Sequence, residues 1–306
     1  MTWRLHLTNR AIYRLDMLNT QIPLLAIWTQ PDRVAFYEQE SGVSTGDLLL
    51  DIPEAMMRSS DEWRAFLADV IAPNGAFLPR ITTPQATIYM TEDGRMRLYQ
   101  VGSVGLYLET DGQEITLDVS GIEDFVSLAF DGLMGVIAGL DQSGKLQLYQ
   151  QNIRLGTFDL GLETQDQLRP AIVISRGGSA IFATDGRCLV LTDTGGQVQK
   201  QTGVHYFVGR MACSPDGRYL ATSDIETGVV RVYNGHDLAP THQRFAIDLL
   251  AEATQIQLLA DLPPTTVAPG SLAINNQGIL AFAMSGVVCV TALEQMDELP
   301  RPQPLL

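Results

Sequence analysis

Residues 208–234 read VGRMACSPDGRYLATSDIETGVVRVYN, and this stretch predicts two consecutive β-hairpins. Val208–Cys213 is short and apolar, and residues 214–217 (SPDG) have the proline and glycine placement of a tight turn. Tyr219–Ser223 is apolar again, and a second turn at Thr227-Gly228 leads into the β-branched and aromatic run VVRVY. Because each run is too short for a helix, the stretch is predicted to form three antiparallel strands.

Looser copies of the second turn and the strand after it recur along the chain. They read PDRVAFYE from Pro31, DGRMRLYQ from Asp93, SGKLQLYQ from Ser143, DGRCLVLT from Asp185, TGVVRVYN from Thr227 and SGVVCVTA from Ser285. An apolar strand precedes each copy. The copies recur every 40 to 60 residues or so, and a four-stranded propeller blade takes roughly 40 to 50. The pattern therefore predicts an all-β fold, a six-bladed β-propeller of four-stranded blades.

The predicted blades span about 11–53, 77–120, 125–161, 170–203, 208–262 and 270–292. The last has only three strands, whereas residues 2–8 (TWRLHLT) alternate large apolar with polar residues and precede any repeat. We expect this N-terminal strand to pair with the last blade and close the ring, which removes exposed sheet edges. Residues 1–296 would then be one propeller domain, followed by a flexible proline-rich tail at 297–306.

Two points of the blade assignment stay open. The fourth strand of the second blade lies either in the hairpin at 101–112 or near 114–119. Seven blades are the alternative to six, with residues 53–80 or 100–120 supplying the additional one.

Two short inserted helices are predicted between strands. Residues 59–70 (SSDEWRAFLADV) begin with a capping-box pattern and place Trp63 and Phe66 on one face. Residues 243–253 have apolar residues at a spacing of four, which moves the outer strand of the fifth blade to 256–262. On that assignment the first helix lies in a connection between two blades and the second lies between the third and fourth strands of one blade. These two kinds of connection lie on opposite faces of a propeller, so the helices are expected on opposite faces.

The segment SPDGRYLATS…VVRVYN resembles the WD-repeat β-propellers. Such repeats usually end their third strand with Trp-Asp, where this chain has Tyr233-Asn234, and their Gly-His pair is echoed by Gly203-Val204-His205. The other copies end in Tyr-Glu or Tyr-Gln, or lack the pair. The resemblance therefore implies the propeller fold, and the hydrogen-bonded network that the missing residues build in the family is not expected here.

The composition argues against several classes of partner. The formal net charge is −15, and Lys145 and Lys200 are the only lysines. Nucleic acids and anionic membranes are disfavoured, because both are bound through lysine and arginine. The first residues lack the apolar core of a secretion signal, and the three cysteines are odd in number, so we expect a reduced, cytoplasmic protein.

Motifs for catalysis and cofactor binding were sought and not found. The chain has no Walker A pattern, no G-x-S-x-G elbow and no H-E-x-x-H, and His236 and His242 flank Pro240 in poor geometry for a metal. The sequence therefore predicts no catalytic, cofactor or metal residues. The alternative is a lactonase-like or hydrolytic propeller enzyme with a metal at the central channel, since some six-bladed propellers place carboxylates there. The predicted first strands are almost free of ionisable groups, which favours a non-enzymatic scaffold.

Acidic residues recur in the predicted turns between second and third strands. One interpretation is ordinary turn chemistry, and the other is a negative face that selects a protein partner with a basic segment. The helix at 59–70 either packs as a lid on the propeller or offers an exposed tryptophan to that partner. The candidate partner-binding residues are Asp61, Glu62, Trp63, Phe66, Glu92, Asp93, Asp141, Asp185, Asp224 and Glu226. The predicted function is thus a protein-protein interaction scaffold in a multiprotein assembly.

Overall fold

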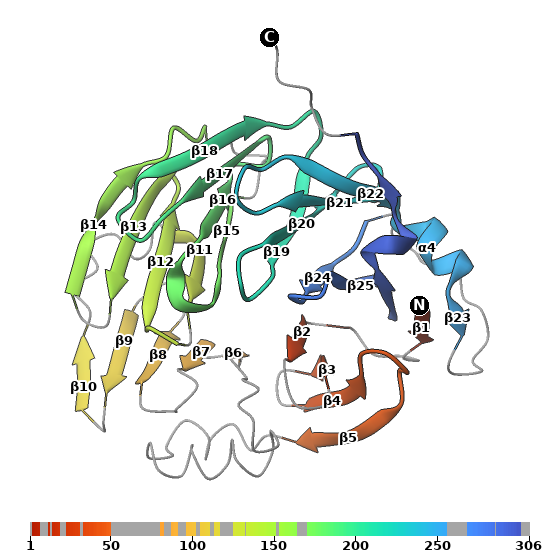
Figure 1. The fold of residues 1–306 in the computed structure, drawn as a ribbon. Coiled ribbons are helices and arrows are strands. Elements are labelled where there is room, and N and C mark those ends of the chain that lie inside the picture. The colour runs from red at the N-terminus through yellow and green to blue at the C-terminus, as the bar shows by residue number, and fades with distance from the viewer. Residues whose placement is uncertain are drawn as a thin grey trace.

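The protein is folded mainly into antiparallel β-sheets, as the sequence predicts. The structure, a computed structural model, describes residues 2–6, 12, 14–18, 23–30, 33–49, 80–82, 87–90, 96–101, 105–110, 113–116, 125–131, 133–150, 153–163, 170–255, 268–284 and 286–300. The described strands form six sheets of four or five strands each, and consecutive strands pair within every sheet. Figure 1 shows the sheets fanned side by side about a common centre, which is the arrangement of a propeller.

The first three sheets take up the N-terminal half of the chain. One consists of β2 (Arg14–Leu18), β3 (Leu24–Gln30), β4 (Arg33–Glu38) and β5 (Ser44–Leu49). The next has five strands, β6 (Arg80–Thr82), β7 (Thr87–Met90), β8 (Met96–Val101), β9 (Gly105–Thr110) and β10 (Gln113–Thr116). The third is β11 (Phe125–Phe130), β12 (Val136–Asp141), β13 (Lys145–Gln150) and β14 (Ile153–Asp159). In the β6–β10 sheet, β9 is the fourth strand and β10 is the fifth, so both segments left open by the sequence are strands.

The other three sheets follow in the C-terminal half. One is β15 (Ala171–Ile174), β16 (Ile181–Thr184), β17 (Cys188–Thr192) and β18 (Val198–Gly203), with the 3-10 turn η2 at Arg176–Gly178. The next is β19 (Val208–Cys213), β20 (Tyr219–Asp224), β21 (Val229–Asn234) and β22 (Pro240–Phe245), followed by helix α4 (Ala246–Glu252). The last is β24 (Ser271–Ile274), β25 (Ile279–Met284) and β26 (Val287–Ala292), with η3 at Leu293–Gln295.

The stretch that decides the fold forms the two hairpins predicted for it. β19 pairs with β20, and β20 pairs with β21, both antiparallel. In the turn between β19 and β20, Gly217 has φ +71° and its N–H donates to the Ser214 carbonyl at 2.9 Å. The turn between β21 and β22 presses against this one, since a Cβ on Gly235 would lie 1.8 Å from the Gly217 carbonyl oxygen. Only glycine fits at residue 235.

The N-terminal strand β1 (Trp3–His6) pairs antiparallel with β26, as the sequence predicts for residues 2–8. The register runs from Trp3 opposite Val290 to His6 opposite Val287. The buried indole N–H of Trp3 donates to the Gln39 carbonyl at 2.9 Å, on the turn that follows β4. The chain's first strand is therefore held by the last sheet through the main chain and by the first sheet through a side chain.

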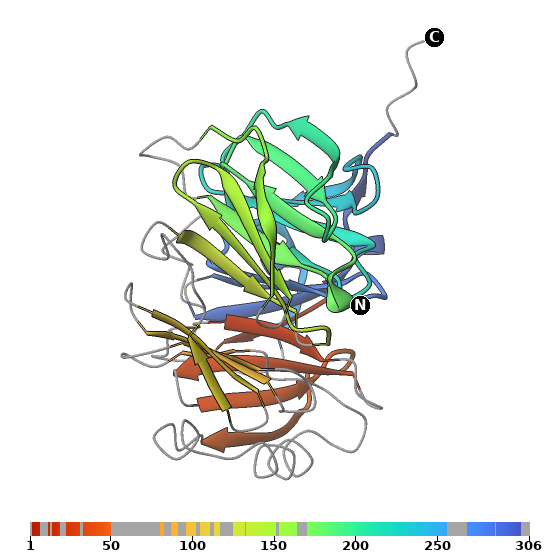
Figure 2. The same cartoon turned by 90° about the vertical axis from the view of Figure 1, so that its left-hand side faces the viewer.

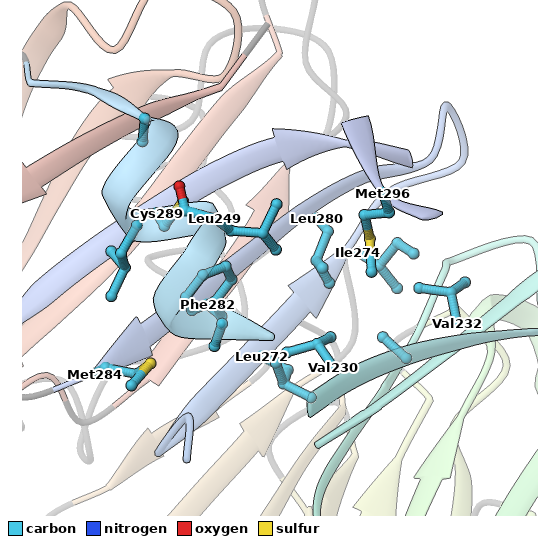
Figure 3. Packing of buried hydrophobic residues seen from close by; sticks show 14 of the residues in the cluster. Val230, Val232, Leu249, Leu272, Ile274, Leu280, Phe282, Met284, Cys289 and Met296 are labelled. Atoms are coloured by element: carbon cyan, nitrogen blue, oxygen red, sulfur yellow. The ribbon is translucent and has the colours of Figure 1, made fainter. Parts of the chain in front are cut away.

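Apolar side chains fill the space between neighbouring sheets. Trp3, Leu15 and Ile27 pack with Ala281 and Val288, which joins the first sheet to the last. In Figure 2 the blue strands of the last sheet lie between the red strands and the cyan ones. Further clusters join the third sheet to the fourth, the fourth to the fifth and the fifth to the sixth. Figure 3 shows the last of these, where Leu249 of α4 packs beside Leu280 and Phe282.

The outer strand of the β19–β22 sheet was predicted wrongly. It is β22 at 240–245, which pairs with β21, and residues 256–262 lie outside the described residues. The segment PTHQRF has no apolar alternation because most of its side chains are half-exposed, as suits an outermost strand. Helix α4 therefore follows the outer strand, and the reason for placing the two inserted helices on opposite faces is removed.

The predicted flexible tail begins with a short strand. β27 (Asp297–Glu298) pairs with β22, and the Leu299 N–H donates to the Thr241 carbonyl at 2.8 Å. Another short strand, β23 (Thr254–Gln255), pairs parallel with β1. Both additions cover outer sheet edges, which would otherwise expose unpaired main-chain groups. Residues 301–306 lie outside the described residues.

Replacing Trp3 by alanine should lower the free energy of unfolding by about 3–5 kcal/mol, because the substitution empties a buried site between two sheets. The matched control is Thr2→Ala, which removes a hydroxyl that contacts the Thr291 hydroxyl at 2.9 Å and should cost about 1 kcal/mol. Urea unfolding followed by circular dichroism measures both. A Trp3→Ala protein as stable as the Thr2→Ala protein would contradict the role given to this strand.

Candidate functional site

One face of the molecule gathers two kinds of segment, and we call it the connection face. It carries the turns between the second and third strands and the connections that lead from one sheet to the next. Main-chain hydrogen bonds join the two kinds, from the Val208 N–H to the Gly186 carbonyl at 2.8 Å and from the Ala246 N–H to the Gly228 carbonyl at 3.0 Å. Four candidate residues within the described part of the chain, Asp141, Asp185, Asp224 and Glu226, lie here.

Asp185 is buried, with 5% of its surface exposed. One carboxylate oxygen accepts the N–H groups of Arg187 at 2.7 Å and Cys188 at 2.8 Å within its own turn. The other accepts the Glu163 N–H at 3.1 Å, from the connection that arrives from the preceding sheet. This carboxylate therefore fastens two segments of the connection face together, and its oxygens are occupied by main-chain donors.

Asp224 is the corresponding residue of the next sheet and is 3% exposed. Its carboxylate accepts the Glu226 N–H at 3.0 Å and the Thr227 hydroxyl at 2.5 Å. The Gly228 N–H donates to the Asp224 carbonyl at 3.0 Å, and the Ile225 N–H donates to Phe207 of the neighbouring connection at 2.9 Å. The turn is thus fixed by one buried acid. Glu226 on the same turn contributes its main-chain N–H, and its side chain is exposed.

Asp141 is half-buried and holds only its own turn. Its carboxylate accepts the Ser143 N–H and hydroxyl and the Lys145 N–H, at 2.8–2.9 Å. The remaining candidates lie outside the described residues: Asp61, Glu62, Trp63, Phe66, Glu92 and Asp93. Partner binding by any of the candidates stays a prediction.

Acidic turns also occur on the opposite face, where sequence reasoning placed no site. Asp131 is buried, and its carboxylate accepts the N–H groups of Leu133, Met134 and, in the next sheet, Gly177, at 2.8–3.2 Å. Asp193 likewise accepts the N–H groups of Gly195 and Gln197 within its turn. Aspartate therefore recurs in turns mostly because its carboxylate accepts main-chain N–H groups of the turn. Buried acids hold the loops in this way, and only exposed acids are available to contact a partner.

A buried polar network lies beneath the connection face in the sheet that resembles a WD repeat. The Tyr206 hydroxyl contacts the Thr222 hydroxyl at 2.8 Å and the Tyr233 hydroxyl at 2.6 Å. The Arg231 guanidinium lies 4.0 Å above the Tyr206 ring and 3.9 Å from the Asp224 carboxylate. Tyr233 occupies the position where the family usually has tryptophan, and the adjacent His205 is exposed. Sequence reasoning did not expect a network in this sheet, and tyrosines supply it.

The two tyrosines of this network and a cysteine of the same sheet keep their protons. Burial raises the pKa of the Tyr206 and Tyr233 hydroxyls, so both keep their protons well above neutral pH. The cysteines are free, and burial raises the pKa of the Cys213 thiol to about 12, which suppresses the reactive thiolate. Within the described residues no three His, Cys, Asp or Glu side chains are grouped so that they could hold a metal ion.

Exposed apolar side chains are the feature of the connection face that sequence reasoning passed over. Ile225, Phe245 and Ile247 are each about half-exposed, and Asp248 beside them is exposed. Phe245 was expected within the inserted helix at 243–253, on the face away from the acidic turns, and it ends β22 as the N-cap of α4; Ile225 lies in a turn. The sequence signal that could have found this feature is an isoleucine at the tip of an otherwise polar turn.

No helix within the described ranges is long and apolar enough to span a membrane.

Comparison with known proteins supports the fold. No protein-family model and no curated protein sequence matches the chain. Raptor of Chaetomium thermophilum is similar in structure, with 11% identity, a TM-score of 0.52 and coverage of 96% of this chain but 25% of the Raptor chain. A chain in a crystal structure of the mitotic checkpoint complex has 11% identity and a TM-score of 0.46, over 95% of this chain and 94% of that one.

This chain thus corresponds to a quarter of the Raptor chain. At such low identity the likeness shows the fold alone, a WD-repeat-like propeller. In all, 1360 chains of solved structures match, so the fold is widely shared and does not by itself indicate a function.

Replacing Asp185 by alanine should destabilise the protein more than the same change at Asp141. The change at Asp185 leaves three main-chain N–H groups without an acceptor at a buried site and should lower the free energy of unfolding by about 2–3 kcal/mol. At Asp141 water can take the place of the lost carboxylate as acceptor, so the loss should be smaller. Thermal unfolding of the two variants at one protein concentration measures the difference. Equal melting temperatures would show that Asp185 does not fasten the two segments.

Proposed function

We propose that the protein is a non-enzymatic scaffold that binds protein partners through its connection face within a multiprotein assembly. In this proposal the six sheets are the blades of a six-bladed propeller, closed by β1 on the last sheet. The pairing of β1 with β26 and the bond from Trp3 to Gln39 support closure, because together they link the last sheet to the first. The free cysteines support a reducing compartment, the cytoplasm.

The proposal rests on one observation, which is that some acids of the connection face are buried and others are exposed. Asp185 and Asp224 are buried and hold the loops, while Glu226, Asp248 and Glu163 are exposed. A surface of this kind is rigid because of its framework and negative because of the acids that remain. Rigid loops lose little conformational entropy on binding, and exposed charge directs a partner of opposite charge. We propose that the predicted helix with Trp63 and Phe66 adds apolar contacts to the same partner surface.

Catalysis needs titratable groups that converge on one point, and the described acids are instead spread over separate turns. Their carboxylates face main-chain donors of their own loops. This favours binding over hydrolysis as the use of the connection face. The partner is expected to carry a basic segment, since the chain's net charge is −15.

Capture of partners from a lysate of the source organism tests the proposal. We would compare the wild type with Glu226→Lys/Asp248→Lys on the connection face and with Glu40→Lys/Glu294→Lys on the opposite face, since all four side chains are exposed. The same proteins should be recovered by the wild type and the second variant and lost with the first. Association with a recovered partner should slow as salt is raised, because exposed charges are screened.

Recovery of every partner by both charge variants would contradict binding at the connection face. Recovery of nothing beyond a bare-resin control would contradict the scaffold role itself. Circular dichroism melts of both variants keep these outcomes separate from misfolding.

A further inference from the structure

Three of the exposed apolar side chains belong to two segments of one sheet that a main-chain hydrogen bond joins. We call this part the β22 rim: the turn at 224–228, and residues 245–248, where β22 ends and α4 begins. Ile225, Phe245 and Ile247 on the rim are 55%, 49% and 47% exposed. Scattered apolar residues on a surface need no explanation, but three within two hydrogen-bonded segments form a local feature that calls for one.

The rim is held rigidly beneath these side chains. Asp224 fixes the turn, and the Ala246 N–H donates to the Gly228 carbonyl at 3.0 Å, which joins the turn to the start of α4. Phe245 lies opposite Val229 in the β21–β22 ladder. Leu249 and Leu250 of α4 are buried in the core between sheets, as Figure 3 shows for Leu249, so the helix itself is anchored. Apolar groups presented on an anchored backbone bind at a lower entropic cost than groups on a loose loop.

Two exposed carboxylates lie on the rim itself. Glu226 and Asp248 are exposed on the rim, and neither takes part in a described hydrogen bond through its carboxylate. The neighbouring cation, Arg244, is already engaged, because its guanidinium contacts the Glu252 carboxylate and donates to the Gln295 carbonyl at 2.6 Å. A ligand therefore meets apolar surface that carries two exposed carboxylates.

We propose that the β22 rim is a docking site for a short peptide segment of a partner protein, with apolar side chains flanked by lysine or arginine. The apolar side chains of the segment cover Phe245, Ile247 and Ile225, and its basic residues pair with Glu226 and Asp248. This inference rests on the scaffold function proposed above and specifies the chemistry of the ligand. It does not involve Trp63 or the predicted helix at 59–70.

A display library of short random peptides, selected on the full-length protein, tests the rim directly. Enriched peptides would be synthesised and their affinity measured by fluorescence anisotropy. The rim variant is Phe245→Ser/Ile247→Ser, and the control is Leu133→Ser/Met134→Ser on the opposite face, where the two side chains are 51% and 48% exposed. The rim variant should keep its fold, since residue 245 is the N-cap of α4 and serine is a favoured N-cap.

The enriched peptides should carry apolar residues flanked by lysine or arginine. The rim variant should bind them at least about tenfold more weakly, whereas the control should bind within about twofold of the wild type. Equal binding by the rim variant, or enrichment of peptides without basic residues, would overturn the inference and leave the scaffold function standing if lysate capture succeeds. Failure of both the library and the lysate to yield any binder would overturn the two proposals together.

Discussion

The pairing of β1 with β26 is the interaction on which the rest of the arrangement depends. It brings residues from the two ends of the chain into one sheet, so the last sheet cannot be completed until the whole chain is present. Trp3 adds a side-chain link, because its indole bonds Gln39 and Gln39 in turn accepts the Asn275 amide at 2.6 Å. Without this strand β26 would present an open edge, and the apolar cluster between the first and last sheets would lose Trp3 and Leu5.

The turns follow from a second constraint, which is that buried main-chain donors need acceptors. One short carboxylate can accept several N–H groups at once, and this explains why aspartate recurs in turns on both faces. Asp185 also takes a donor from the connection that arrives from the preceding sheet, and Asp131 takes one from a turn of the next sheet, so each ties its own turn to a neighbouring segment. The outcome is a surface whose shape is set by buried acids and whose charge is set by exposed ones.

The sequence predicted the parts of the fold that depend on local pattern. Apolar runs separated by glycine turns identified most of the strands, and the alternation in TWRLHLT identified β1. β22 was missed because an outermost strand buries neither face fully, so PTHQRF shows no period. β27 was missed because its strand state comes from pairing with β22 and not from its own residues. Burial of Asp185 and Asp224 could not be read from the sequence either, because it is produced by loops of neighbouring sheets. The exposure of Phe245 and Ile247 likewise depends on which side of α4 faces the core.

Hydrogen exchange at the amides of β1 tests the central claim most directly, since it measures how that strand opens relative to its neighbours. If β1 is an integral strand of the last sheet, its paired amides should exchange with the same free energy of opening as those of β25 and β26, through global unfolding. Fast exchange of the β1 amides while β25 and β26 stay protected would show that the strand detaches on its own. That result would contradict the claim that the arrangement of the sheets depends on β1.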